Sequence, residues 1–129
     1  MKGGRYAAQA TAVQRDRIVM VKELGCICCQ MNRADGRPTA FFGVAEAHHL
    51  LSGGRRRGHE FTIGLCQWHH RGVPPFESAR ASDMVQTFGP SVATGSRAFH
   101  GRYGTDDELL EYQEQLLAGA RAVLEEAKV

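Results

Sequence analysis

The sequence concentrates its four cysteines and four of its six histidines in three short stretches. Residues 25–29 are GCICC, residues 46–51 are EAHHLL, and residues 65–72 are LCQWHHRG. Thiolates and imidazoles are ligands that zinc prefers, and one structural ion needs only four of them. Because two of the stretches contain a histidine pair, we expect a structural metal ion beside a reactive one.

Two ligand pairs have the spacing of a structural zinc site. Cys26 and Cys29 form a C-x2-C pair, and Cys66 and His69 form a C-x2-H pair. Together they supply the four ligands of a tetrahedral ion, which contributes folding free energy on the order of 10 kcal/mol. Cys28 is a surplus thiol that could replace a neighbour, although the two-residue spacing favours Cys26 and Cys29. The alternative is four buried, inert cysteines, which such tight clustering makes a weaker interpretation.

The histidine pairs predict two roles for adjacent imidazoles. If His69 completes the zinc site, His70 is left for another role. His48 and His49 end an expected strand, where adjacent side chains face opposite sides, so only one of them can join a given metal ion. We assign His48 and His70 as ligands of a second ion and His49 as the general base, because imidazole titrates near neutral pH. The alternative for any single histidine is a surface or core residue without a chemical role.

A basic, glycine-rich segment, SGGRRRGHE, lies between the two histidine pairs at residues 52–60. Guanidinium groups match the geometry of phosphate oxygens, so we expect Arg55, Arg56 and Arg57 to contact phosphates of a nucleic acid. We expect Arg71, next to His70, to help hold the scissile phosphate. The alternative is a basic surface hairpin without a ligand.

Length and charge limit the class of protein. A chain of 129 residues is expected to form one small domain. No apolar run approaches the roughly 20 residues that span a bilayer, and the N-terminus lacks the apolar centre of a signal peptide. We therefore expect a cytoplasmic protein, whose cysteines have metal-binding or redox roles rather than forming disulfides. Residues 1–80 are basic and residues 81–129 are acidic; the basic part would attract a polyanion such as DNA, unless the charges merely follow solvated faces.

The elements that must position these clusters follow from periodicity and from turn-forming residues. Residues 1–7 are expected to be a flexible tail before one domain at 8–129. A helix is expected over residues 8–24, ended by Gly25 directly before the cysteines. A strand or two over residues 39–51 would end at the first histidine pair, a second strand would occupy 61–66, and a helix or tight turn would begin at 67.

The second half of the chain is expected to be irregular at first and then helical. Residues 73–104 contain many breakers, with a short helix within 78–88. TDDE at 105–108 is a capping box that opens a C-terminal helix over about 105–127. One face of that helix, from Leu109 to Ala127, would pack on the core or on a second copy. The expected fold class is α+β, a small zinc-stapled domain with flanking helices.

Residues 47–72, AHHLLSGGRRRGHEFTIGLCQWHHRG, resemble the ββα-metal, or HNH, nuclease motif. In that motif a strand carries the base histidine, a second strand returns, and a helix supplies the closing metal histidine. The order of the cysteine and histidine motifs, followed by FGPS at 88–91 and FHGRYG at 99–104, is similar to the phage recombination-enhancement nucleases of the Ref type. The similarity covers roughly residues 26–110.

The resemblance implies an HNH-like fold with bound zinc and DNA endonuclease activity that nicks phosphodiesters on DNA held by a RecA-type recombinase filament. It also implies a bacterial host cytoplasm and a prophage origin. Carried onto this chain, His49 is the general base and His48 and His70 bind the active-site metal. The structural zinc is bound by Cys26, Cys29, Cys66 and His69.

One element of the general HNH pattern is missing, because residues 60–64 (EFTIG) contain no asparagine. His59 is the candidate to orient the base or to complete the metal shell, and His100 is a further candidate metal ligand. The active-site ion is left open between zinc, magnesium and manganese, as is the oligomeric state. Two rival functions are a non-catalytic zinc module that binds nucleic acid or a recombinase, and a redox or metal-sensing domain.

Overall fold

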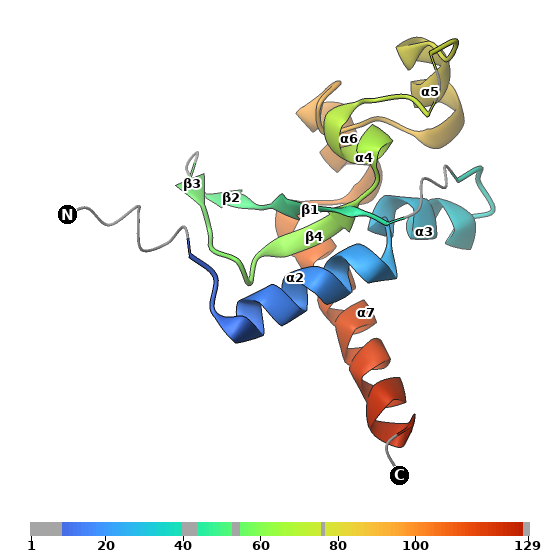
Figure 1. Cartoon of the computed structure of the whole chain (residues 1–129). Coiled ribbons are helices and arrows are strands. Elements are labelled where there is room, and N and C mark those ends of the chain that lie inside the picture. Colours follow the sequence, from blue (N-terminus) through green and yellow to red (C-terminus); the bar gives the residue numbers. More distant parts are fainter. Residues whose placement is uncertain (1–8, 40–43, 53–54, 76, 128–129) are drawn as a thin grey trace.

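The computed structural model describes residues 9–39, 44–52, 55–75 and 77–127. The expected flexible tail at residues 1–7 lies outside the described residues. The fold class is α+β, as expected (Figure 1). The helices are α2 (Ala12–Leu24), α3 (Ile27–Ala34), α4 (Gln67–Arg71), α5 (Ala81–Phe88), α6 (Ser96–Tyr103) and α7 (Asp106–Ala127), and the strands are β1 (Glu46–His49), β2 (Leu51–Ser52), β3 (Arg55–Arg56) and β4 (Thr62–Leu65).

Two antiparallel strand pairs lie within the described residues, and the pair β1–β4 is the central one (Figure 1). β1 pairs with β4, so that His48 lies opposite Ile63 and His49 opposite Thr62. β2 pairs with β3 at the start of the basic, glycine-rich segment, with Leu51 opposite Arg56 and Ser52 opposite Arg55. The chain then enters α4 directly after β4. The order of strand, returning strand and helix therefore brings the two histidine pairs to neighbouring elements.

Helix α2 begins and ends at local signals in the sequence. Thr11 and Gln14 form a reciprocal capping box at its start, which places the first helical residue at Ala12 rather than at residue 8. Gly25 ends the helix with φ 91°, a backbone conformation that glycine adopts without a steric penalty. The predicted termination directly before the first cysteine is confirmed.

Strand β4 is buried along its whole length because α2 and α7 both pack on it. A Cβ atom at Gly64 would lie 2.7 Å from the carbonyl oxygen of Gly25 and 2.8 Å from that of Val21, so the close approach of α2 requires glycine. From α7, the Gln113 side-chain oxygen accepts a hydrogen bond of 2.7 Å from the Gly64 amide. Arg17 of α2 donates to the Thr62 carbonyl at 2.8 Å. These contacts fix the strand that leads into α4.

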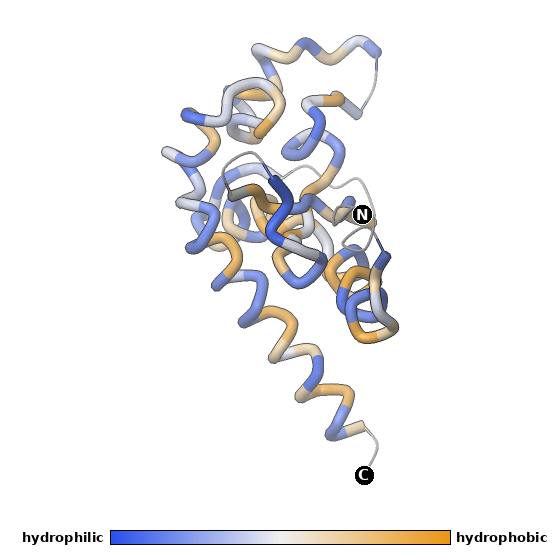
Figure 2. Tube along the Cα trace, turned by 90° about the vertical axis from the view of Figure 1, so that its left-hand side faces the viewer, coloured by the Kyte–Doolittle hydropathy of each residue, from blue (hydrophilic) through white to orange (hydrophobic). Residues whose placement is uncertain are grey.

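The expected C-terminal helix corresponds to α7, and its capping box is present. The Thr105 amide donates to Glu108 at 2.9 Å, and the Glu108 amide donates to the Thr105 hydroxyl at 3.1 Å. Leu109 is completely buried, but residues 121–127 are all exposed, and Val123 is 65% exposed. The predicted packing face therefore ends near residue 120, because the helix extends past the rest of the domain (Figure 1). Apolar and polar residues continue to alternate along this protruding part (Figure 2).

Two further elements differ from the expectation. α3 runs from Ile27 to Ala34, where no helix was expected. α6 lies within the segment expected to be irregular. It begins at Gly95 without a side-chain cap, so the sequence carries no start signal. Burial of Phe99 and Tyr103 against the core stabilises it instead.

Among the described residues, no helix combines the length and the apolar character needed to cross a bilayer. The core lies around β4 and α4 and includes Trp68 and Phe99, both buried.

Candidate functional site

The structure brings together the four residues predicted to bind structural zinc. The ligand atoms of Cys26, Cys29, Cys66 and His69 all lie within 4.8 Å of one another, and all four residues are buried. His69 Nδ1 lies 3.4, 3.7 and 3.3 Å from the three sulfur atoms, in that order, and the sulfurs of Cys29 and Cys66 are 3.9 Å apart. Ligands about 2.3 Å (sulfur) and 2.0 Å (nitrogen) from a tetrahedral zinc ion are separated by similar distances. The cluster could therefore hold a structural zinc ion.

The first turn of each helix explains why two ligands separated by two residues can face the same ion. Cys26 is the N-cap of α3 and accepts a hydrogen bond from the Cys29 amide at 3.4 Å. Cys66 is the N-cap of α4 and accepts one from the His69 amide at 3.5 Å. In each pair the second ligand stands at the third helical position, so one helix turn presents both ligand atoms on the same side. The sequence at each helix start therefore determines the placement of two of the four ligands.

Hydrogen bonds on the side of the ring away from the sulfur atoms orient His69. Its Nε2 lies 2.9 Å from the Phe88 carbonyl oxygen and 3.1 Å from the Tyr103 hydroxyl. Because the carbonyl can only accept, the ring proton belongs on Nε2, and the Nδ1 lone pair faces the sulfur atoms. The Tyr103 hydroxyl also lies 3.1 Å from the Asn32 side-chain oxygen, which links α6 to α3.

The backbone at the end of α5 allows these hydrogen bonds to form. Gly89 has φ 91°, and a Cβ atom there would lie 2.2 Å from the Tyr103 hydroxyl oxygen. Its carbonyl accepts a hydrogen bond of 2.9 Å from the indole of the buried Trp68. Glycine at this position therefore lets α5, α6 and α4 meet around the ligand histidine.

Without an ion, the cluster favours a thiolate on Cys26 and a second proton on His69 despite their burial, and zinc binding would displace that proton from Nδ1. Burial opposes ionisation of Cys26, but hydrogen bonds from its neighbours outweigh burial and hold the pKa of its thiol well below the usual range. Burial also opposes the charge on His69, yet its hydrogen bonds with Cys26 and Cys66 raise its pKa to about 10. By contrast, burial raises the pKa of the Cys28 thiol. Cys28 is buried but is not part of the four-ligand group.

A second constellation joins β1 to α4. The rings of His48 and His70 lie edge to face with their centroids 5.0 Å apart. Burial, followed by the charge of His70, lowers the pKa of His48 to about 4. The His48 imidazole is therefore neutral near pH 7 and can offer a lone pair to a cation.

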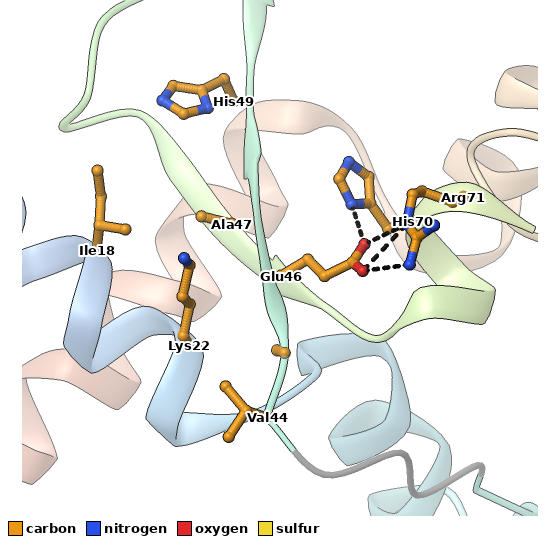
Figure 3. A pocket seen from close by; sticks show the side chains of 9 residues that line it. Ile18, Lys22, Val44, Glu46, Ala47, His49, His70 and Arg71 are labelled. Carbon is orange, nitrogen blue, oxygen red and sulfur yellow. Dashed lines mark hydrogen bonds and ion pairs between the residues drawn. The ribbon is translucent and has the colours of Figure 1, made fainter. Parts of the chain in front are cut away.

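Glu46 is a functional candidate that sequence reasoning did not single out. Its carboxylate accepts a hydrogen bond of 2.8 Å from Nδ1 of His70 and bonds of 2.6–3.0 Å from Arg71 (Figure 3). The hydrogen bonds from Arg71, and then those from His70, hold the pKa of this carboxyl below its usual range. A sequence signal exists, because Glu46 precedes His48 by two residues in a strand and so shares its face.

His49 lies on the opposite face of β1 and is paired with a different histidine. Its Nε2 is 3.2 Å from Nδ1 of His59. Partial burial, and then the positive charges of Arg56 and His59, lower the pKa of His49. His59, which the sequence left between two roles, therefore contacts the predicted base.

His100 is engaged by other partners. Its Nε2 is 2.7 Å from the Asp106 carboxylate, and its Nδ1 is 2.8 Å from the Ser96 carbonyl oxygen. The Ser96 hydroxyl also lies 3.2 Å from Nδ1, so both ring nitrogens are engaged by protein partners in this arrangement. Within the described residues, the cysteine–histidine cluster is the group of three or more metal-ligating side chains that the structure assembles.

A pocket of about 530 Å³ connects the two faces of β1. Glu46, His70 and Arg71 line it on one side of the strand, and Ile18, Lys22 and His49 line it on the other (Figure 3). Beside β1, Arg55 and Arg56 are exposed on β3, whereas Arg57 forms an ion pair of 2.8 Å with Asp107. The predicted phosphate-binding arginines therefore divide into two that are exposed and one that is held by α7.

The fold and the cluster define a small α+β protein with a site suited to structural zinc and with paired histidines beside a pocket. The chain belongs to the recombination enhancement, RecA-dependent nuclease family, whose model matches residues 10–118. The predicted Ref-type relationship is thereby confirmed, and the family is one of nucleases that act in recombination. Neither a curated protein nor a solved structure matches the chain.

Proposed function

We propose that this protein is a metal-dependent DNA endonuclease of the HNH type, which nicks phosphodiester bonds in DNA held by a RecA-type filament. The observation that carries the proposal is the meeting of His48 from β1 with His70 from α4, beside a pocket that His49 also lines. Membership of the nuclease family supports the same reaction class. We place the activity in the cytoplasm of a bacterial host, with a prophage origin.

In this proposal His49 is the general base. It takes a proton from a water molecule that attacks phosphorus, one P–O bond forms, and the bond to the leaving oxygen of the sugar breaks. His59, 3.2 Å away, orients the His49 ring. It would thus do the work of the asparagine that the general HNH pattern has and this chain lacks. Positioned proton transfer of this kind contributes on the order of 10²–10⁴-fold in rate.

His48 and His70 are the residues that would hold the active-site ion. Two imidazoles suit zinc and leave open positions for water and phosphate oxygens, because they do not complete a coordination shell. Manganese and magnesium prefer oxygen ligands and would depend more on those open positions. When bound, the ion stabilises the charge that develops on the leaving oxygen. Arg71 lies next to His70 and carries N–H donors for a phosphate oxygen.

The exposed arginines of β3 are proposed to contact the DNA backbone. Replacing Arg55 and Arg56 together with alanine should weaken DNA binding and flatten its salt dependence, since each lost phosphate contact reduces the slope of log K against log salt by about 0.9. Fluorescence anisotropy at several salt concentrations measures the slope. Arg121→Ala is the matched control, because Arg121 lies in the exposed end of α7. An unchanged slope in the double variant would exclude β3 as a DNA contact.

A non-catalytic zinc module that binds nucleic acid or a recombinase is the second candidate. It is favoured by the absence, among the described residues, of a third protein ligand beside His48 and His70. Incubation of the purified protein with supercoiled plasmid separates the two candidates. Zinc, magnesium and manganese are each supplied, with and without a recombinase filament on the DNA.

We expect relaxed plasmid with at least one ion, and more product when the filament is present. Lack of nicking under every condition would reject the endonuclease and leave the binding module.

A further inference from the structure

We propose that Glu46 is a positioning residue, which sets the orientation of His70 toward the active-site ion and of Arg71 toward the DNA phosphate. One carboxylate contacts both side chains, which are neighbours on α4 and lie 24 and 25 residues further along the chain. The inference rests on the proposed function, because it assigns a role to Glu46 only if His70 binds an ion.

The contact with His70 selects one tautomer of the imidazole. Nδ1 of His70 lies 2.8 Å from a carboxylate oxygen of Glu46. An ionised carboxylate only accepts, so the ring proton resides on Nδ1, and the Nε2 lone pair is available to a cation. A carboxylate behind a metal-binding histidine also raises the basicity of the ring and restrains its rotation.

The register of β1 explains how Glu46 reaches this position. Glu46 and His48 are two residues apart in the strand and therefore face the same side of it. His48 meets the His70 ring with its imidazole, and Glu46 meets the Nδ1 edge of that ring. The strand thus supplies one proposed ligand and the support for the other.

The contact with Arg71 holds a guanidinium group ready for a phosphate. Nε of Arg71 donates to both carboxylate oxygens at 2.9 and 3.0 Å, and Nη2 donates to one of them at 2.6 Å. A guanidinium has five N–H groups. Within the part of the chain that the structure describes, these bonds use the Nε–H and one N–H of Nη2. The remaining donors face away from the carboxylate and suit phosphate oxygens.

A purely structural role for this ion pair would leave metal affinity unchanged. Arg71 is 54% and Glu46 33% exposed in their side chains, and exposed ion pairs contribute little to folding stability. Loss of the pair is therefore expected to leave the fold and the structural zinc intact. The positioning role and the structural role can then be separated by measurements on a folded variant.

The test is Glu46→Gln in the zinc-loaded full chain, titrated with cobalt or manganese to fill the second site. We expect a 10- to 100-fold weaker affinity for the added ion, the range typical of lost second-shell carboxylates. Nitrogen chemical shifts of His70 in the metal-free second site should move toward the tautomer with the proton on Nε2. Glu60→Gln, which removes an exposed carboxylate that accepts a hydrogen bond from Gln14, should change neither quantity.

Further variants separate the contact of Glu46 with His70 from its contact with Arg71. They also separate the role of Glu46 from the proposed metal site itself. Arg71→Ala should weaken DNA binding while the affinity for the ion stays within a few-fold of wild type. If His48→Ala and His70→Ala abolish binding of the ion but Glu46→Gln leaves the affinity and the tautomer unchanged, the role of Glu46 is wrong and the proposed metal site stands. If neither histidine variant affects binding, the proposed metal site itself is wrong.

Discussion

Replacing Cys66 with serine is expected to abolish binding of structural zinc and to unfold much of the domain at room temperature. Cys66 is both a member of the buried ligand cluster and the N-cap of α4, so the change removes a thiolate from one end of the helix that carries His69 and His70. Structural zinc contributes roughly 10–16 kcal/mol in small zinc domains. Domains of this size have net stabilities of about 5–15 kcal/mol, so loss of the ion is expected to be decisive.

Zinc content per chain and circular dichroism on heating measure this effect. Wild type should contain one tightly held zinc ion and Cys66→Ser none, with a lower or absent melting transition. Cys28→Ala is the matched control, because Cys28 is equally buried on α3 and is not one of the four ligands. The control should keep its zinc. A full complement of zinc in Cys66→Ser, or an equal loss in Cys28→Ala, would overturn the assignment of the ligands.

Replacing His49 with alanine is expected to reduce the rate of nicking by about 10²–10⁴-fold, the usual contribution of a positioned general base. His49 is partly exposed on β1, lines the pocket and is not one of the four residues of the zinc cluster. The variant should therefore keep its structural zinc, its melting temperature and its affinity for DNA. A single-turnover nicking assay on supercoiled plasmid measures the rate.

His59→Ala is the informative companion to that variant. Loss of the hydrogen bond of 3.2 Å frees the His49 ring but leaves the base in place, so we expect a smaller loss of rate than in His49→Ala. Equal zinc content in the two variants shows that the comparison is between folded proteins. A wild-type rate in His49→Ala would remove His49 from the reaction, and a larger loss in His59→Ala would reverse the two roles.

Several parts of the fold were predictable because they depend on residues close together in the chain. The end of α2 at Gly25 and the capping box at Thr105 and Glu108 arise from hydrogen bonds and backbone conformations within a few residues. The start of α6 lacked such a signal, and its stability comes from burial of Phe99 and Tyr103. Exposure of the end of α7 could not be predicted either, because a periodic apolar face does not reveal where its packing partner ends.

The candidate site also has one part that the local sequence predicted and another part that depends on tertiary structure. The sequence by itself determined the zinc-type ligand set, because a cysteine N-cap and a ligand three residues later face the same side of one helix turn at both Cys26 and Cys66. Only the tertiary structure decided which carboxylate supports His70 and which histidine contacts His49. Those pairs join residues 10 to 24 positions apart, and they depend on the register of β1 against β4 and on the position of α4. Register and helix position are set by packing of the whole core, which local spacing does not encode.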